Sequence, residues 1–166
     1  MFKIVDSIFS NISFKILAKA IVIISQEDEF MQYLVSKLGD EKEVVFKFMQ
    51  FDTTANIAFK KSIGSNILLS SKNVNEKADI TITSKCMNVT YSLINGTRSV
   101  ADCYNQQAFV AIGDVRQSTT IVNILSYALA TILYRKSYID YYVDMPKFKI
   151  SSGKLIGKIL FGRVKK

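Results

Sequence analysis

Histidine is missing from this chain of 166 residues, which has only two cysteines and one proline. Without histidine, Ser-His-Asp hydrolysis is excluded, as are zinc sites that need an imidazole ligand. The cysteines, Cys86 and Cys103, form no C-x-x-C pair, so we interpret both as reduced structural thiols. A glycine-rich phosphate-binding loop of the P-loop or Rossmann type is also missing from the sequence. We therefore expect no enzyme, no cofactor and no bound metal.

Apolar residues and a basic C-terminal segment are what the chain does have. Hydrophobic residues make up 49% of it and charged residues 22%, which is typical of a globular protein. The mean hydropathy of +0.18 is positive, which favours a protein that contacts lipid. A chain of this length favours one domain with appendages and can bury roughly 70% of its unfolded surface. Of the net charge of +8, Arg135–Lys166 carries +7, so the basicity belongs to the end of the chain.

The middle of the chain predicts a strand followed by a helix. In Ala78–Thr83, Ile80 and Ile82 alternate with polar residues, which is the period of a strand with one buried face. Ser84 predicts the start of the helix, because a serine hydroxyl satisfies the first backbone N–H groups. Gly96 predicts its end, because glycine readily takes the left-handed conformation after a last turn.

A polar connection then leads to a second strand and a long helix. The strand is the apolar run Ala108–Ile112. Asp114 is a suitable N-cap with Gln117 three residues later, so the apolar run from Val115 to about Tyr134 is predicted to be helical. Its apolar residues cover more than a narrow stripe, so this helix must be buried on more than one side.

The first segment, Met1–Ile24, reads as an amphipathic helix with apolar residues three and four apart. Lys15 and Lys19 interrupt its apolar region and no small-residue cleavage site follows, so it is not interpreted as a signal peptide. It is also too short and too charged to span a bilayer. Two interpretations stay open. The helix packs on its own domain or on a second copy, as a homodimer, or it docks on a membrane surface.

The segment after this helix predicts a second helix and a meander of strands. Ser25–Asp28 resembles a capping box, and the helix it opens should end at Gly39. Val44–Phe51, Ile57–Phe59 and Asn66–Ser70 read as three strands joined by short polar turns, which favours antiparallel pairing. The predicted fold class is therefore α+β, with a largely antiparallel sheet of about five strands covered by helices.

Two stretches of the middle region resemble a known family. Ala78–Ile82, with the sequence Ala-Asp-Ile-Thr-Ile, and Phe109–Asp114, ahead of the long apolar helix, resemble the second half of the sterol carrier protein type-two lipid-binding domain. The first half of that domain would be Gln26–Ser71. The resemblance implies a lipid-binding domain over residues 25–135, an amphipathic helix over 1–24 before it and a basic extension over 136–166 after it.

The function implied is that of a non-enzymatic lipid carrier. Such a protein holds a sterol, fatty acyl chain or other lipid in an apolar cavity, here between the sheet and the long helix, and exchanges it at membranes. The expected lining residues are Phe46, Phe48, Ile57, Phe59, Phe109, Ile121, Leu125, Leu129 and Ile132. The alternative is an accessory protein–protein interaction module that reuses the fold with a filled core.

The basic C-terminal extension alternates basic and apolar residues after Pro146, a composition that anionic lipid headgroups attract. The expected membrane contacts are Lys147, Lys149, Lys154, Lys158, Phe161 and Arg163. A solvated chain end is the open alternative. Nucleic acid is not an expected partner, because the basic residues are mixed with aliphatic ones rather than with aromatic platforms. We expect a cytoplasmic protein that can be peripheral at the membrane.

Overall fold

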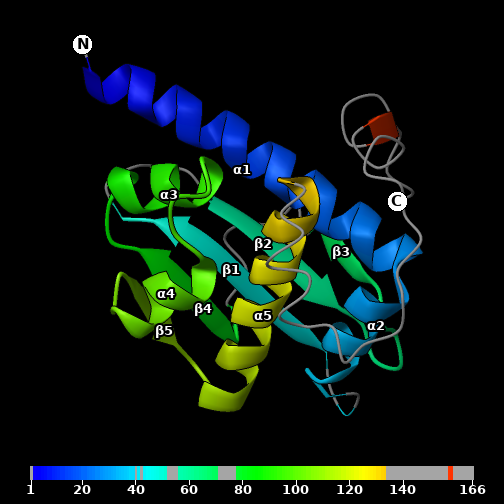
Figure 1. Ribbon diagram of the computed structural model, residues 1–166. Helices are drawn as coiled ribbons and strands as arrows, with labels where there is room; N and C mark the ends of the chain where they lie inside the picture. The colour runs from blue at the N-terminus through cyan, green and yellow to red at the C-terminus, as the bar shows by residue number, and fades with distance from the viewer. Residues whose placement is uncertain are drawn as a thin grey trace.

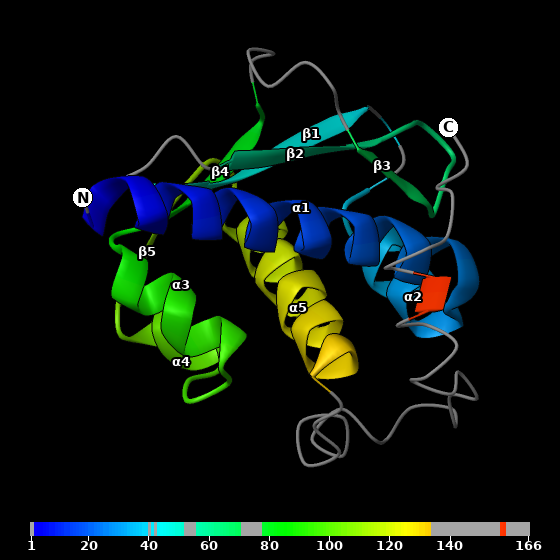
Figure 2. The same ribbon diagram turned by 90° about the horizontal axis from the view of Figure 1, so that it is seen from above.

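The computed structural model of the chain describes residues 2–39, 41, 43–51, 56–70, 78–133 and 157–158; the side chains of residues 2–10 and 94 lie outside this description. Five strands form one sheet in the order β3-β2-β1-β4-β5. Figure 2 shows the helices α1 to α5 together on one side of this sheet. The predicted α+β class with a five-stranded, mostly antiparallel sheet is confirmed.

The strands include the predicted meander. They are β1 Val44–Gln50, β2 Asn56–Lys61, β3 Leu68–Ser70, β4 Ile80–Ser84 and β5 Phe109–Ile112. The first three pair antiparallel in sequence order. β4 lies beside β1 and parallel to it, and β5 pairs antiparallel with β4 at the edge, so the sheet is mixed.

Alternation along the strands decides which side chains face the helices. Ile80 and Ile82, which alternate with polar residues in the sequence, are both fully buried. Phe46 on β1 is paired with Phe59 on β2, and their rings stack with centroids 5.0 Å apart. The inner face of the sheet is therefore an apolar floor for the helix layer.

The helices are α1 Phe2–Glu27, α2 Glu29–Ser36, α3 Met87–Ile94, α4 Val100–Asn105 and α5 Val115–Ile132. Two predicted starts are wrong. The N-cap of α2 is Asp28, because Ser25 is buried and donates to the Val22 carbonyl within α1. The N-cap of α3 is Cys86, because Ser84 is still the last residue of β4.

Helix α4 lies where the sequence predicted only a polar connection. Six residues are too few to produce a readable hydrophobic period. The local signal is a capping box, in which Ser99 accepts from the Asp102 N–H and the Asp102 carboxylate accepts from the Ser99 N–H. Val100 and Cys103 are its buried residues.

Helix α1 crosses the helix layer from α3 at one end to α2 at the other (Figure 1). Its second half is part of the core, where Ala20, Ile21 and Ile24 are completely buried. The sequence left open whether this helix packs on its own chain, on a second copy or on a membrane surface. The second half of α1 packs on its own chain. None of the described helices is long and apolar enough to cross a bilayer.

Helix α5 lies over the middle of the sheet, with α4 on one side and α2 on the other, and is crossed by α1 (Figures 1 and 2). It starts as predicted, because the Asp114 carboxylate accepts from the Gln117 N–H at 2.8 Å. The Gln117 side chain does not complete a capping box but donates to the Leu38 carbonyl at 3.1 Å. This bond ties the start of α5 to the end of α2.

Candidate functional site

An apolar cavity of about 120 Å³ lies between α1, α3, α4, α5 and the inner face of the sheet. Its lining consists of Ser13, Phe14, Ile16, Leu17, Phe48, Thr90, Leu93, Val100, Phe109, Leu125, Leu129, Ile132 and Leu133. Two of these side chains carry a hydroxyl, and the others are hydrocarbon. Such a surface can shield an apolar molecule from water.

Three phenylalanine rings in the cavity lining contact one another, two from the sheet and one from α1. Phe48 projects from β1, where it is paired with Ile57 on β2 and Ile82 on β4. Its ring lies 5.1 Å from that of Phe14 on α1 and 5.6 Å, edge to face, from that of Phe109 on β5. The first contact is tilted and the second edge to face, the latter being an arrangement that aromatic pairs prefer.

The lining residues differ in how exposed they are to solvent, and this difference separates a closed end of the cavity from an open side. Thr90, Leu93 and Val100, from α3 and α4, are all buried. Ile16 on α1 is 40% exposed, and Ile132 and Leu133 at the end of α5 are half-buried. Among the described residues, the exposed side of the lining therefore lies between α1 and the C-terminal end of α5, two helices in direct contact (Figure 2), and we call this side the mouth.

The structure brings five of the nine sequence-predicted lining residues together at the cavity. These are Phe48, Phe109, Leu125, Leu129 and Ile132. The remaining four, Phe46, Ile57, Phe59 and Ile121, are buried in the core instead, away from the cavity. That any of these residues binds lipid stays a prediction.

Sequence reasoning missed the contribution of α1, α3 and α4. The stripe of apolar residues along α1 was readable, and Ile16 belongs to it, but the stripe does not say which element it faces. Phe14 and Leu17 line the cavity because α1 packs across both α3 and α5. Leu93 and Val100 join them because α3 and α4 close the far side.

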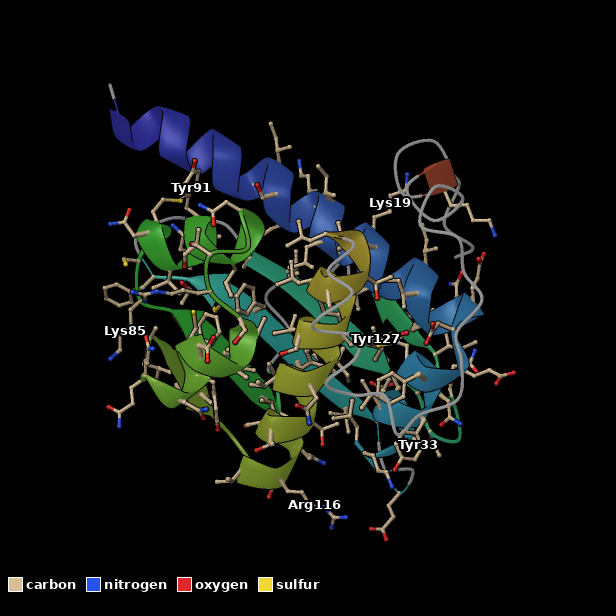
Figure 3. All side chains as sticks on the ribbon, in the orientation of Figure 1. Lys19, Tyr33, Lys85, Tyr91, Arg116 and Tyr127 are labelled. Carbon is tan, nitrogen blue, oxygen red and sulfur yellow. The ribbon has the colours of Figure 1, made fainter. Side chains whose placement is uncertain are left out.

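A buried hydrogen-bonded pair anchors the α5 wall of the cavity. The Tyr127 hydroxyl on α5 donates to Asp28 Oδ2 at 2.9 Å, and Asp28 Oδ1 accepts from the Met31 N–H at 2.7 Å. Figure 3 shows Tyr127 reaching from α5 toward α2. Because Tyr127 lies between Leu125 and Leu129 in the sequence, this pair fixes the stretch of α5 that carries both lining residues.

Burial has electrostatic consequences for this pair. Asp28 is only 2% exposed, and this burial raises the pKa of its carboxyl, an effect that hydrogen bonds from Met31 and Tyr127 oppose. Burial, together with the neighbouring Asp28, also raises the pKa of the Tyr127 hydroxyl. Tyr127 is therefore a neutral donor, and the pair serves positioning.

The cysteines lie apart from any reactive arrangement. Cys103 is buried and Cys86 half-buried, and neither forms a disulfide. Burial raises the pKa of the Cys103 thiol, which disfavours the nucleophilic thiolate. Within the described part of the chain, no group of three Cys, Asp or Glu side chains could hold a metal ion.

Of the predicted membrane contacts, Lys158 is described and the other five lie outside the described residues. Lys158 Nζ lies 2.5 Å from Glu27 Oε1 at the end of α1, and the side chains are 52% and 37% exposed. An ion pair this exposed contributes little to stability, about 0–1 kcal/mol. Membrane contact by these residues stays a prediction.

No protein-family model matches the chain, and no curated protein matches it either. Among solved structures, the chain is similar to sterol carrier protein 2 from Yarrowia lipolytica in its apo form. The sequences are 17% identical, the match covers 75% of this chain and 94% of that chain, and the TM-score is 0.44.

Two further similarities concern the same kind of domain. One is with sterol carrier protein domain 2 of Helicoverpa armigera, with 19% identity over 71% of this chain and 86% of that one and a TM-score of 0.42. The other is with the ubiquinone synthesis protein UbiJ-SCP2, with 11% identity over 71% of this chain and 89% of that one and a TM-score of 0.46. All three of these structures are named as sterol carrier protein 2 or SCP2 proteins.

Proposed function

We propose that the chain is a non-enzymatic lipid carrier that binds an apolar molecule, such as a sterol, a fatty acyl chain or another lipid, in the cavity between the helix layer and the sheet. The observation that carries the proposal is the cavity itself. It is lined almost entirely by hydrocarbon, has a buried closed end and opens at one side. Transport of this kind needs a shielded apolar site and no covalent step.

The size of the cavity limits how a ligand is held. At about 120 Å³ it is smaller than the ~300–1,000 Å³ typical of sites for drug-sized ligands, and close to the ~150 Å³ cavity that holds a benzene ring. One end of an apolar ligand therefore occupies the closed end, and the rest lies in the mouth between α1 and α5. Each methylene buried contributes about 0.8 kcal/mol.

A substitution that fills the cavity tests this proposal. Leu129 lines it from α5 and is half-buried, so Leu129→Trp should occupy the space without a full rearrangement of the core. We expect displacement titrations with the fluorescent dye N-phenylnaphthylamine to show a loss of binding of about tenfold or more. Arg116→Trp, an exposed position at the start of α5, is the matched control and should bind as the unmodified protein does.

Equal dye affinity in the Leu129→Trp variant and the unmodified chain would contradict the proposal. So would the absence of any co-purifying lipid in native mass spectrometry combined with no dye binding. Thermal unfolding followed by circular dichroism distinguishes a filled cavity from a lost fold, because only the latter lowers the Tm sharply.

A second candidate is an accessory interaction module with a filled core. The small volume favours it, as do the four predicted lining residues that pack in the core. Its partner surface would include the exposed side of α1, where Ile12 is 54% and Ile16 40% exposed, through which a second copy could also dock. A stoichiometric co-purifying lipid would favour the carrier, and a stable homodimer without lipid would favour the module.

We further propose that the carrier meets its donor and acceptor membranes through the basic C-terminal extension. Its charge of +7 and its interleaved apolar residues support reversible binding to anionic lipid.

A further inference from the structure

The closed end of the cavity contains one buried polar side chain. Thr90 lines the cavity from α3 and is only 2% exposed. Its hydroxyl donates to Ser84 Oγ at 3.3 Å, and Ser84 Oγ in turn donates to the Cys86 carbonyl at 3.2 Å. Ser84, the last residue of β4, is completely buried. The other cavity hydroxyl, that of Ser13 on α1, is half-buried on the same helix as the mouth residue Ile16.

The direction of this chain of hydrogen bonds decides what Thr90 offers to a ligand. A carbonyl oxygen can only accept, so in the bond between Ser84 and Cys86 the Ser84 hydroxyl is the donor. Its single proton is then engaged, and Ser84 Oγ accepts the hydrogen bond from the Thr90 hydroxyl. The Thr90 proton therefore points away from the cavity. With this proton committed to Ser84, the Thr90 hydroxyl can offer a ligand only a lone pair of Oγ1, which accepts hydrogen bonds.

We propose that Thr90 is a specificity-determining residue that accepts a hydrogen bond from a single hydroxyl on an otherwise apolar ligand. This inference rests on the proposed function and names the ligand class within it. A ligand hydroxyl buried at the closed end would be destabilising without a partner, and Thr90 supplies one. A carboxylate end is disfavoured there, because an anion would meet an acceptor lone pair and none of the described lining residues is a cation.

Two ligands that differ in one proton test the inference. n-Octanol donates a hydrogen bond, whereas its methyl ether only accepts, and both should displace N-phenylnaphthylamine from the full chain. A neutral hydrogen bond of ordinary strength predicts that the unmodified protein prefers the alcohol by about fivefold. Thr90→Val keeps the shape and removes the acceptor, so this preference should fall to one or below, because the alcohol then buries a donor without a partner, while the affinity for the ether is unchanged.

Two further variants separate the role of Thr90 from a general change in the cavity. Thr90→Ser keeps a hydroxyl and should retain the preference for the alcohol. Ser13→Ala removes the other cavity hydroxyl and should also retain it, because a half-buried position leaves the ligand hydroxyl accessible to water.

Equal affinities of the unmodified protein for alcohol and ether would overturn the inference while leaving the carrier proposal intact, as would a Thr90→Val variant that still prefers the alcohol. A shift of the preference in Ser13→Ala alone would assign the ligand hydroxyl to the mouth and overturn the inference. If neither ligand displaces the dye, both the inference and the carrier proposal are wrong.

Discussion

At Gly113 the backbone leaves no room for a side chain. It lies between β5 and α5 with a φ of +127°, and a Cβ atom built on it would lie 2.5 Å from the Asp79 carbonyl oxygen. That distance is to backbone, which cannot move aside as a flexible side chain could. Glycine at this position therefore permits the close approach of the turn to the start of β4.

We expect Gly113→Ala to lower the free energy of unfolding by about 3–5 kcal/mol, because it adds a steric clash to the strain of a positive φ. Urea denaturation followed by circular dichroism measures the loss. Gly39→Ala is a matched control, since Gly39 has a φ of +90° but no atom within 4 Å of an added Cβ. It should cost only about 1–2 kcal/mol. Equal losses for the two variants would refute the role of the close contact.

At the scale of elements, α5 is held against α2 at two points. Near its start, Gln117 donates to the Leu38 carbonyl, and in its middle Tyr127 donates to Asp28. The second contact is supported by an edge-to-face contact between Tyr127 and Phe30, with ring centroids 4.7 Å apart. Together these contacts orient the helix that supplies the mouth and one wall of the cavity.

Tyr127→Phe should lower the free energy of unfolding by about 1–3 kcal/mol, because the ring remains while a buried Asp28 oxygen loses its donor. Thermal and urea unfolding measure the effect. Tyr33→Phe is the control, since Tyr33 is 46% exposed and its loss of a hydroxyl should change stability by no more than about 0.5 kcal/mol (Figure 3). Similar small losses for both variants would mean that the Tyr127 hydroxyl does not anchor α5.

At the scale of the whole molecule, charge is distributed unevenly. Arg135–Lys166 carries +7 of the net +8, so most of the chain is nearly neutral and its end is basic. Coulomb attraction to anionic lipid acts mainly within a Debye length of the surface, ~10 Å at 0.1 M salt and ~3 Å at 1 M. Apolar side chains in the same segment can insert and are not screened by salt.

Truncation after Met145 should therefore abolish sedimentation with anionic vesicles and leave the domain folded. The fold should survive because the five strands, the five helices and the core cluster that the structure describes all lie before residue 134. Binding of the full chain should weaken as salt is raised, and vesicles of zwitterionic lipid are the control. If the truncated protein binds anionic vesicles as tightly as the full chain, the exposed side of α1, with Ile12, Lys15 and Ile16, becomes the better candidate for the membrane contact.

The sequence by itself determined the elements whose signals are local. Alternation of Ile80 and Ile82 predicted β4, Asp114 predicted the start of α5, and Gly96, with a φ of +69°, marks the predicted end of α3. These features depend on neighbours within a few residues, so they can be read directly. The start of α2 was misplaced because Ser25 Oγ accepts a long-range hydrogen bond from the Leu68 N–H. The start of α3 was misplaced because Ser84 is still paired with Gln50 and Phe109 in the sheet.

Only the tertiary structure decided which apolar residues meet the cavity. Phe46 and Phe48 lie two residues apart on the same face of β1, yet Phe46 packs against Phe59 in the core and Phe48 lines the cavity. Periodicity determines the face of a strand that is buried, but not which helix crosses each position on that face. That choice follows from the path of α1 between α3 and α2, which depends on contacts between residues far apart in the chain.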